Sequence, residues 1–415
     1  MSERTVHVIG AGLSGLSAAI TLAGRGARVQ VHEGAAQAGG RCRSYHDPQL
    51  DMVIDNGNHL VLSGNTAVRD YLAAIGASDR LAGPDESAIA FADLASGARW
   101  TLRPNAGPLP WWIFDGRRRV PGTGPGDYLA LAALLWPGRD RPIREALNGR
   151  GALWDRLLHP FLLAALNTEP EAGSTRLAAA VVRETLAKGG DACRPRIASP
   201  TLSAAFVDPA LAYLAAHGVS VRLGRRVRAL GLEHGRVAML DLPSGPLALG
   251  ADDQVILAAP PWVAQELVPG LTAPDEFRAI VNAHFRIAPP AGAEPILGVI
   301  GATAEWIFAF PDRISVTISA ADRLLSEDRE HLAARIWADV AKAHGMTAAL
   351  PPWQIVKERR ATFAATPAQD AKRPGARTAH ANLFLAGDWT ATGLPATIEG
   401  ALRSGRTAAH LALAG

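Results

Sequence analysis

Three glycines near the start of the chain have the spacing of a phosphate-binding turn. Gly10, Gly12 and Gly15 form the pattern G-x-G-x-x-G. The first permits a tight turn, the second lets backbone approach a pyrophosphate, and the third allows close packing of a helix on a strand. Glu33 lies 23 residues beyond Gly10, near the distance expected for an acid that binds a ribose 2′-hydroxyl. Because such an acid disfavours a 2′-phosphate, the pattern favours FAD or NAD over NADP.

Two further segments could complete a flavin site. The loop Gly39-Gly40-Arg41 follows the acid, and its arginine could neutralise a pyrophosphate from the other side. Residues 384–388 read FLAGD, a strand ending in Asp388, whose carboxylate could bind a ribityl chain. A helix expected near Ile398 would then stabilise negative charge on a reduced flavin. Taken singly, Arg41 also fits a surface cation and Asp388 a turn residue; together the segments favour FAD over NAD.

Hydrophobic periodicity predicts the elements that position these residues. Residues 5–9 and 28–32 have the β-branched composition of strands, and the segment between them has apolar residues at helical spacing. This is a strand–turn–helix–strand unit of about 30 residues, the size of a βαβ motif. Strand-like runs return at 219–223, 255–259 and 382–386. We therefore predict an α/β fold with a Rossmann-like FAD-binding domain.

The remaining sequence predicts an inserted substrate-binding domain. Residues 65–205 alternate helical patterns with segments rich in Pro and Trp, and residues 270–355 are mixed. We predict that these two stretches form a mixed, largely helical substrate-binding domain. The FAD-binding domain then comprises residues 1–64, 206–269 and 356–415.

Composition excludes several classes of protein. The chain has 415 residues and is 48% hydrophobic, so it can bury a large core. A formal charge of +3, from 42 basic and 39 acidic residues, does not indicate a nucleic-acid partner. Two cysteines, Cys42 and Cys193, make neither a disulfide framework nor a metal cage. We therefore expect no metal site and a reducing compartment, the cytoplasm. The longest apolar runs are too short to span a membrane.

Four longer segments carry a family resemblance: IDNGNHLVL at 54–62, LLHPFLLAALNT at 157–168, ERRATFAATPA at 358–368 and LFLAGDWTATGLPATIEGALRSG at 383–405. With the glycine motifs, they make the chain resemble the superfamily of FAD-dependent amine oxidases and phytoene desaturases over nearly its whole length. More narrowly, it resembles the hydroxysqualene dehydroxylases, also called squalene-associated FAD-dependent desaturases. Amine oxidases of the superfamily often have an aromatic cage near the C-terminal motif, but residues 392–396 contain no Tyr or Phe. This departure argues against an amine substrate.

The resemblance implies a set of residues that bind FAD. The adenosine and pyrophosphate would contact Gly10, Ala11, Gly12, Ser14, Gly15, Glu33, Gly40 and Arg41. The backbone of Gly57 and Asn58 would lie beside the isoalloxazine, and the main chain of Val227 would meet the adenine. Gly387 and Asp388 would hold the pyrophosphate–ribityl region, and Thr397 and Ile398 would face the flavin pyrimidine edge. No cysteine matches a covalent attachment site, so we expect non-covalent FAD.

The resemblance also implies the reaction, reductive dehydroxylation of hydroxysqualene to squalene. This chemistry needs a hydride from reduced flavin, a proton for the leaving hydroxide and a dry apolar tunnel for a long isoprenoid. His59 is a candidate proton donor or a structural histidine, and Asn167 could orient the hydroxyl or cap a helix. We expect both inserted segments to build the tunnel, with aromatic residues including Trp111, Trp112, Phe161 and Phe308. NADPH is the candidate electron donor.

Two other functions stay open from the sequence. An oxidative desaturase or oxidase of an isoprenoid or carotenoid-like molecule would differ only in the direction of flavin redox chemistry. A prenyl-binding carrier would need no flavin, and the complete set of phosphate-binding glycines speaks against it.

Residues 111–136 contain a mixture that fits contact with a membrane. The segment combines two adjacent tryptophans, the basic run Arg117-Arg118-Arg119 and the apolar run 129–136. Such a surface could dip into an anionic interface at the inner face of the membrane, and the mean hydropathy of +0.07 is compatible with this. The alternative is a helical lobe with a solvated basic loop.

Overall fold

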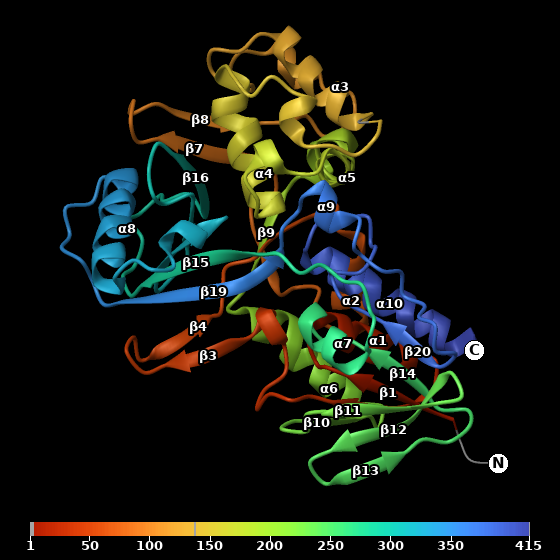
Figure 1. Ribbon diagram of the computed structural model, residues 1–415. Coiled ribbons are helices and arrows are strands. Elements are labelled where there is room, and N and C mark those ends of the chain that lie inside the picture. The colour runs from red at the N-terminus through yellow and green to blue at the C-terminus, as the bar shows by residue number, and fades with distance from the viewer. Residues whose placement is uncertain (1–3, 137, 415) are drawn as a thin grey trace.

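A parallel sheet of five strands occupies the lower part of the molecule in Figure 1. The computed structural model describes residues 4–136 and 138–414. The strand order is β10-β2-β1-β14-β20, and every adjacent pair is parallel. The strands are β1 (Thr5–Ile9), β2 (Arg28–His32), β10 (Ser220–Arg222), β14 (Gln254–Leu257) and β20 (Leu383–Leu385). The sheet thus joins the beginning, middle and end of the chain.

Both faces of this sheet are covered, as apolar parallel strands require. Val8, Val31 and Ile256 are fully buried beneath helices on one face. Those helices are α1 (Leu13–Ala23), α2 (Thr66–Ala74), α6 (Asp208–Ala216) and α10 (Ile398–Ala414). Leu257 and Leu385 pack on the opposite face. The elements there are α7 (Pro261–Leu267) and an antiparallel meander of β11 (Ala229–Glu233), β12 (Arg236–Leu242) and β13 (Gly245–Ala248).

The first and last of these helices approach each other closely. A Cβ at Gly405 of α10 would stand only 2.1 Å from the carbonyl oxygen of Ser14 in α1. The hydroxyl of Ser17 also donates a hydrogen bond to the carbonyl of Leu402 over 2.8 Å. Any larger residue at 405 would push the helices apart, so this glycine fixes α10 on α1.

A second, mixed sheet of seven strands has the order β19-β15-β18-β17-β16-β7-β8. Its strands are β7 (Ile89–Asp93), β8 (Arg99–Leu102), β15 (Phe277–Phe285), β16 (Ile296–Ile300), β17 (Trp306–Ala309), β18 (Ile314–Ile318) and β19 (Trp353–Phe363). One face is aliphatic and packs on α8 (Arg329–His344). The other face is polar on β15 and β18, at Asn282 and Thr317, and aromatic on β17, at Trp306 and Phe308. Polar and apolar regions therefore adjoin on one surface.

A helical lobe lies above the aromatic part of that sheet, at the top of Figure 1. Its helices are α3 (Leu129–Leu135), α4 (His159–Leu166) and α5 (Thr175–Glu184), and a π-helical segment, Trp154–Leu158, leads into α4. The remaining elements are β3 (Ser44–Asp47), β4 (Met52–Asp55), β5 (Leu60–Leu62), β6 (Leu81–Ala82), β9 (Pro195–Ala198) and α9 (Pro367–Asp370). None of the helices described has the length and apolar composition needed to cross a bilayer.

The architecture confirms the predicted α/β class with a parallel sheet, and several elements differ from what the sequence predicted for their segments. Residues 65–205 were expected to be largely helical, but they supply β7 and β8 to the second sheet. β19 crosses the boundary at 356 and pairs with β15, so the second sheet ends at Phe363. α2, placed in the substrate-binding segment, packs instead with α1 and α10. These elements differ from the prediction because the sequence of a short amphipathic segment does not indicate which distant segment it will pair with or pack on.

Candidate flavin site

The glycine-rich turn joins β1 to α1, and its three glycines meet different surroundings. Gly10 has a φ of 107°, and a Cβ there would stand 2.6 Å from the carbonyl oxygen of Ala258. A Cβ at Gly15 would stand 1.9 Å from the carbonyl oxygen of Gly10. At Gly12, by contrast, no described atom lies within 4 Å of a Cβ. The turn is closed at Gly10 and Gly15 and open at Gly12, where a phosphate group fits.

The start of α1 and Glu33 border the open side of the turn. Gly12 precedes α1 and offers no side chain to cap it, so the first N–H groups of the helix are available to an anion; Ser14 lies in this first turn. The carboxylate of Glu33 accepts hydrogen bonds from the N–H groups of Ala11 (2.6 Å) and Ala35 (2.7 Å). Glu33 is therefore held beside the turn, and its oxygens keep lone pairs for a ribose hydroxyl.

An ion pair joins the second and third sequence motifs. Arg41 Nη2 lies 2.8 Å from Asp388 Oδ1 and 2.7 Å from Asp388 Oδ2, although 347 positions separate the residues. The N–H of Gly39 donates to the carbonyl of Ala11 over 2.8 Å, which fixes the arginine loop against the glycine turn. The Asp388 side chain is only 8% exposed, whereas that of Arg41 is 44% exposed. The guanidinium therefore extends from a buried carboxylate toward the open part of the site.

The loop that carries Asp388 is held by a buried arginine. Arg373 donates to the carbonyl oxygens of Asp388 (3.1 Å) and Thr390 (2.9 Å, from Nε). The N–H of Gly387 donates to Ser404 Oγ over 2.9 Å, which ties the loop to α10. Arg373 was not identified from the sequence, because an isolated arginine in a loop has no distinctive spacing.

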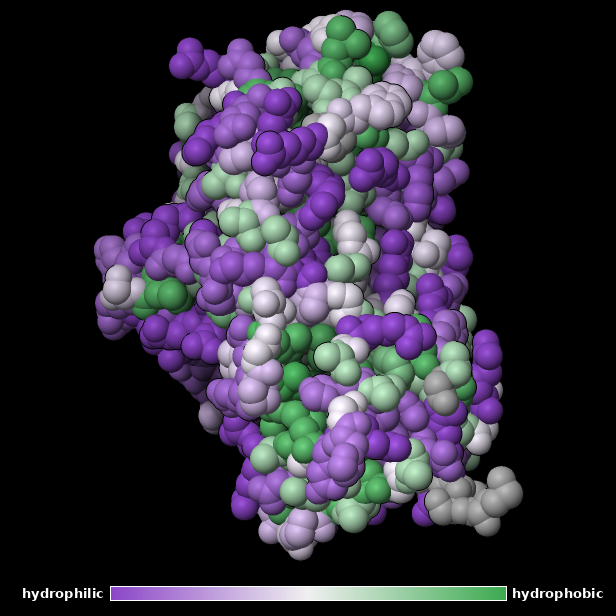
Figure 2. Space-filling model, turned by 45° about the vertical axis from the view of Figure 1, so that its right-hand side comes forward, coloured by the Kyte–Doolittle hydropathy of each residue, from purple (hydrophilic) through white to green (hydrophobic). Residues whose placement is uncertain are grey.

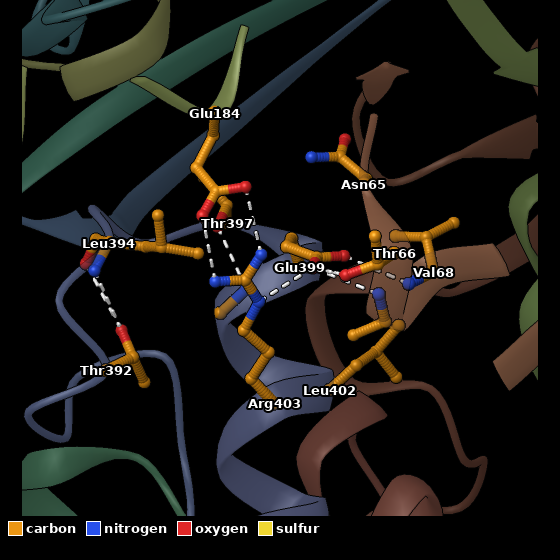
Figure 3. A network of polar contacts seen from close by, with 12 residues as sticks. Asn65, Thr66, Val68, Glu184, Thr392, Leu394, Thr397, Glu399, Leu402 and Arg403 are labelled. Carbon is orange, nitrogen blue, oxygen red and sulfur yellow. Dashed lines mark hydrogen bonds and ion pairs between the residues drawn. The ribbon is translucent and has the colours of Figure 1, made fainter. Parts of the chain in front are cut away.

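The N-terminus of α10 is fixed by Glu399 (Figure 3). Its carboxylate accepts hydrogen bonds from the N–H groups of Ala67 and Val68, both at 3.0 Å, at the start of α2. It also accepts from Arg403 Nε at 2.7 Å. Just before the helix, Thr397 Oγ1 accepts from the N–H of Gly400 over 3.0 Å. The predicted contact residues Thr397 and Ile398 therefore stand at a helix end whose direction is set. In the sequence, Glu399 belongs to the EGA stretch at 399–401, within the C-terminal segment that carries the family resemblance.

The loop at Gly57 and Asn58 lies on the polar part of the second sheet. Asn58 Nδ2 donates to Thr317 Oγ1 (3.1 Å), Thr317 Oγ1 donates to Asn282 Oδ1 (2.8 Å), and the Asn58 N–H approaches the same Asn282 oxygen (3.3 Å). A Cβ at Gly57 would stand 2.9 Å from Asn282 Nδ2. Asn58 Oδ1 is buried without a hydrogen-bond partner among the described residues. A buried, oriented acceptor of this kind fits an N–H or O–H group supplied by a ligand.

The sequence profile of the flavin containing amine oxidoreductases matches residues 13–413. The chain belongs to this family. A flavin is therefore its cofactor, and the open turn at Gly12 and the unpartnered oxygen of Asn58 fit such a group.

Within the family, the chain is similar to three hydroxysqualene dehydroxylases. It is 57% identical to that of Rhodopseudomonas palustris over 99% of both chains. It is 54% identical to that of Sinorhizobium fredii, over 99% of this chain and 98% of the relative, and 50% identical to that of Zymomonas mobilis over 98% of both. These matches confirm the resemblance drawn from the sequence.

Solved structures of other oxidoreductases share the fold. A cyclohexylamine oxidase from Brevibacterium oxydans superposes with a TM-score of 0.69 at 17% identity, over 99% of both chains. An oxidoreductase from Methanosarcina mazei superposes with a TM-score of 0.71 at 14% identity, over 97% of this chain and 99% of that one.

The segment around Val227 lies against the end of β2. The N–H of Arg225 donates to the carbonyl of Glu33 over 2.7 Å, and a Cβ at Gly34 would stand 3.2 Å from the Arg226 Cβ. Val227 itself is buried. The predicted adenine contact thus lies near the predicted ribose acid, although 194 positions separate Val227 from Glu33.

His59 lies near the Arg41–Asp388 pair and is unprotonated at neutral pH. Burial and the Arg41 guanidinium lower the pKa of its imidazole to about 4, against the weaker raising effects of the Arg41 backbone and the Asp388 carboxylate. A neutral imidazole is a poor proton donor. The predicted role of His59 as the acid therefore conflicts with its ionisation state.

Asn167 has no free polar atom with which to orient a substrate. Its Oδ1 accepts from the N–H of Ala320 (2.7 Å), and its Nδ2 donates to Thr362 Oγ1 (2.9 Å) and the carbonyl of Arg278 (3.4 Å). It also ends α4 with a φ of 47°. Of the two roles considered for Asn167, the structure favours the structural one.

Aromatic side chains adjoin the ion pair. Trp262, Phe277, Phe363 and Trp389 line a cavity of about 20 Å³ together with Arg41, Asp388 and other residues. Trp112 and Phe308 are buried and Phe161 is partly buried in the core that continues from here into the helical lobe. Trp111 is 66% exposed, so its predicted place in a tunnel wall is wrong.

One group of side chains has the spacing of metal ligands. His159, Glu169 and Glu171 have ligand atoms within 4.8 Å of one another on the helical lobe. Glu169 is exposed and the group shares no residue with the flavin site. The expectation of no metal stays a prediction.

Proposed function

We propose that this protein catalyses the reductive removal of the hydroxyl group of hydroxysqualene, giving squalene. The observation that carries this proposal is the identity of at least 50% with three hydroxysqualene dehydroxylases over almost the entire chain. No aromatic residue occupies 392–396, which further disfavours an amine substrate.

FAD is the form of flavin that the site supports, and it would be held without a covalent bond. The turn at Gly12 and the arginine at 41 would bind the pyrophosphate, and Glu33 would bind the ribose of the adenosine half. Burial raises the pKa of the Cys42 thiol far above neutrality and that of Cys193 to about 12. Both cysteines therefore stay protonated and unreactive at neutral pH. Buried free thiols also support the proposed cytoplasmic location.

The reaction replaces a carbon–oxygen bond with a carbon–hydrogen bond and releases water. When bound, reduced flavin supplies the hydride. The hydroxyl leaves as water after it takes one proton, and the two electrons come from an external reductant, for which we propose NADPH. The fixed amide of Asn58 offers an acceptor that orients an entering O–H or N–H group.

The protein itself contributes apolar side chains that exclude water from the reacting centre of the substrate. The aromatic surface of Trp262 and Phe277, with ring centroids 5.1 Å apart, adjoins the Arg41–Asp388 pair. From there an apolar core runs past Trp306 and Phe308 into the helical lobe. Side chains of this kind fit a long isoprenoid and protect an allylic cation-like centre from solvent.

The test is a single-turnover incubation under anaerobic conditions. Purified holoenzyme reduced chemically with dithionite is mixed with hydroxysqualene, and squalene is measured by gas chromatography. We expect squalene in proportion to reduced flavin, and none when the flavin stays oxidised. A desaturated product with oxidised flavin would instead establish the oxidative alternative. A colourless protein that takes up no added FAD would establish the flavin-free carrier.

A further inference from the structure

We propose that the protein docks on an anionic lipid bilayer through one apolar surface of the helical lobe. This surface consists of Leu109, Trp111, Phe114, Leu129 and Trp136 and is called the apolar cap below. The proposal goes beyond the proposed function and does not require it, because lipid binding needs no turnover.

The cap concentrates the exposed apolar side chains of the molecule. Nine large hydrophobic residues are exposed among the residues described, and five of them lie between positions 109 and 136. Those five are 62–78% exposed, whereas the other four are only 37–45% exposed. In Figure 2, green hydrophobic atoms lie at the upper end of the molecule, where α3 lies in Figure 1, and a second green area lies lower on the same face. Clusters of this kind, unlike scattered apolar residues, mark interaction surfaces.

Helix α3 presents its apolar residues to the outside. Its sequence, LALAALL, has no polar residue. Leu134 is buried, and Ala130, Leu131 and Leu135 pack partly on the core, whereas Leu129, Ala132 and Ala133 are exposed. Leu129 and Trp136 stand seven positions apart, two turns along one face, and are 73% and 78% exposed. A helix on a water-facing surface normally carries charged residues on that face. α3 therefore lacks the polar side that contact with water alone would favour.

The cap is held in place by the residues beneath it. Trp112 and Tyr128, the sequence neighbours of Trp111 and Leu129, pack ring to ring with centroids 5.0 Å apart. Asn105 Nδ2 donates to the carbonyl of Leu109 (2.8 Å), and its Oδ1 accepts from the Trp112 N–H (3.2 Å). The Trp112–Tyr128 contact therefore holds the segment of Trp111 and Phe114 against the start of α3.

Charge identifies the occupant as an anionic surface. Residues 103–150 contain eight arginines and four carboxylates, a net of +4, and the whole chain has +3. The segment that carries the cap is therefore positively charged. Exposed Arg117 and Arg139 each follow a cap residue by three positions, and Arg117 also forms a solvent-exposed ion pair with Asp115 over 3.4 Å. Arg118 and Arg119 have structural roles instead, because they donate to the carbonyls of Arg103, Ile113 and Thr123. Exposed tryptophans beside arginines are typical of proteins that enter a lipid headgroup layer.

Vesicle flotation tests the proposal directly. Holoenzyme is mixed with vesicles of phosphatidylcholine alone or of phosphatidylcholine and phosphatidylglycerol in equal parts, at low and high salt. We expect wild-type protein to float with the mixed vesicles and to be released by salt. The triple variant W111S/F114S/W136S should bind more than tenfold more weakly. The double variant R117Q/R139Q should lose about fivefold per arginine and most of the preference for anionic lipid.

A matched control uses exposed leucines outside the cap. The double variant L223S/L232S removes two exposed apolar side chains beside the parallel sheet and should float as wild type does. Equal melting temperatures would show that all variants are folded. Wild-type protein that does not float, or a triple variant that floats equally well, would overturn the proposal.

The same variants separate docking from its alternatives. If light scattering showed a wild-type dimer that the triple variant converts to monomer, without vesicle binding, the cap would be a subunit interface and the proposal wrong. Turnover of hydroxysqualene supplied in detergent micelles tests the proposed function alone. Failure of turnover with normal flotation would reject that function and leave lipid docking intact.

Discussion

Gly12 and Gly15 belong to one motif, yet the structure predicts opposite consequences for the same substitution. Gly12 has φ −71° and ψ 175°, which alanine adopts readily, and its Cβ would meet no described atom within 4 Å. Gly12→Ala should therefore change the free energy of unfolding of the flavin-free protein by less than about 1 kcal/mol. At Gly15 the Cβ would stand 1.9 Å from the backbone of Gly10. Gly15→Ala should destabilise the protein by about 1–3 kcal/mol, with or without flavin.

Gly12→Ala, which should hardly change stability, should instead weaken FAD binding. A methyl group at 12 occupies the space of a phosphate and removes one or two charge-assisted hydrogen bonds, each worth about 1.5–3 kcal/mol. The dissociation constant should rise at least tenfold, which corresponds to about 1.4 kcal/mol. Calorimetric titration of FAD into flavin-free protein gives the affinity, and urea unfolding without FAD gives the stability. Wild-type affinity in Gly12→Ala, or wild-type stability in Gly15→Ala, would refute the assignment of these glycines.

Three further substitutions test other parts of the molecule. Asp388→Asn leaves the Arg41 guanidinium without its carboxylate, so the purified protein should carry less FAD, measured as the ratio of flavin to protein absorbance. Because the arginine is partly exposed, the loss of stability should be only about 1–2 kcal/mol. Unchanged flavin content would contradict this. His59→Gln should leave the shape of the pH profile of squalene formation unchanged between pH 6 and 9, because a ring with a pKa of about 4 does not titrate there; an inflection that only the variant lacks would restore His59 as the acid. Burial raises the pKa of Glu305 from 4.5 to about 7, although the hydrogen bond from the N–H of Ser319 lowers it. Between these two pH values the native state binds more protons than the unfolded state. The free energy of unfolding therefore falls as pH rises from 5 to 8. Glu305→Gln should reduce that fall by about 1–3 kcal/mol, and parallel stability curves for the two proteins would show that Glu305 does not titrate as described.

The sequence predicts well where short-range chemistry decides the structure. Residues 5–32 contain the strand, turn, helix and strand that the hydrophobic pattern indicates, because a glycine turn and an apolar strand constrain only their neighbours. The family resemblance assigned Arg41 and Asp388 to the same cofactor, but the ion pair between them was not predicted, because spacing carries no information across 347 positions.

Long-range pairing explains what the sequence did not predict. β7 and β8 are short and lie among helical patterns, and only their alignment with β16 makes them part of a sheet. α2 resembles other amphipathic helices, but the Glu399 carboxylate at its N-terminus holds it near α10. The lowered pKa of His59 depends first on its burial and then on a guanidinium that another loop brings close. Each of these depends on contacts that form only after folding.

The contact of Gly405 with α1 has a consequence for the order in which the protein is made. The edge strand β20, the carboxylate at 388 and the helix that lies on Ser14 all come from residues 383–414, which are synthesised after the other four strands of the parallel sheet. Until then the N-terminal glycine turn stands beside an unfinished sheet, with the apolar side of α1 uncovered. Flavin capture therefore requires that residues 383–414 be synthesised first, and a nascent chain stalled before residue 383 should expose that helix face to chaperones or proteases.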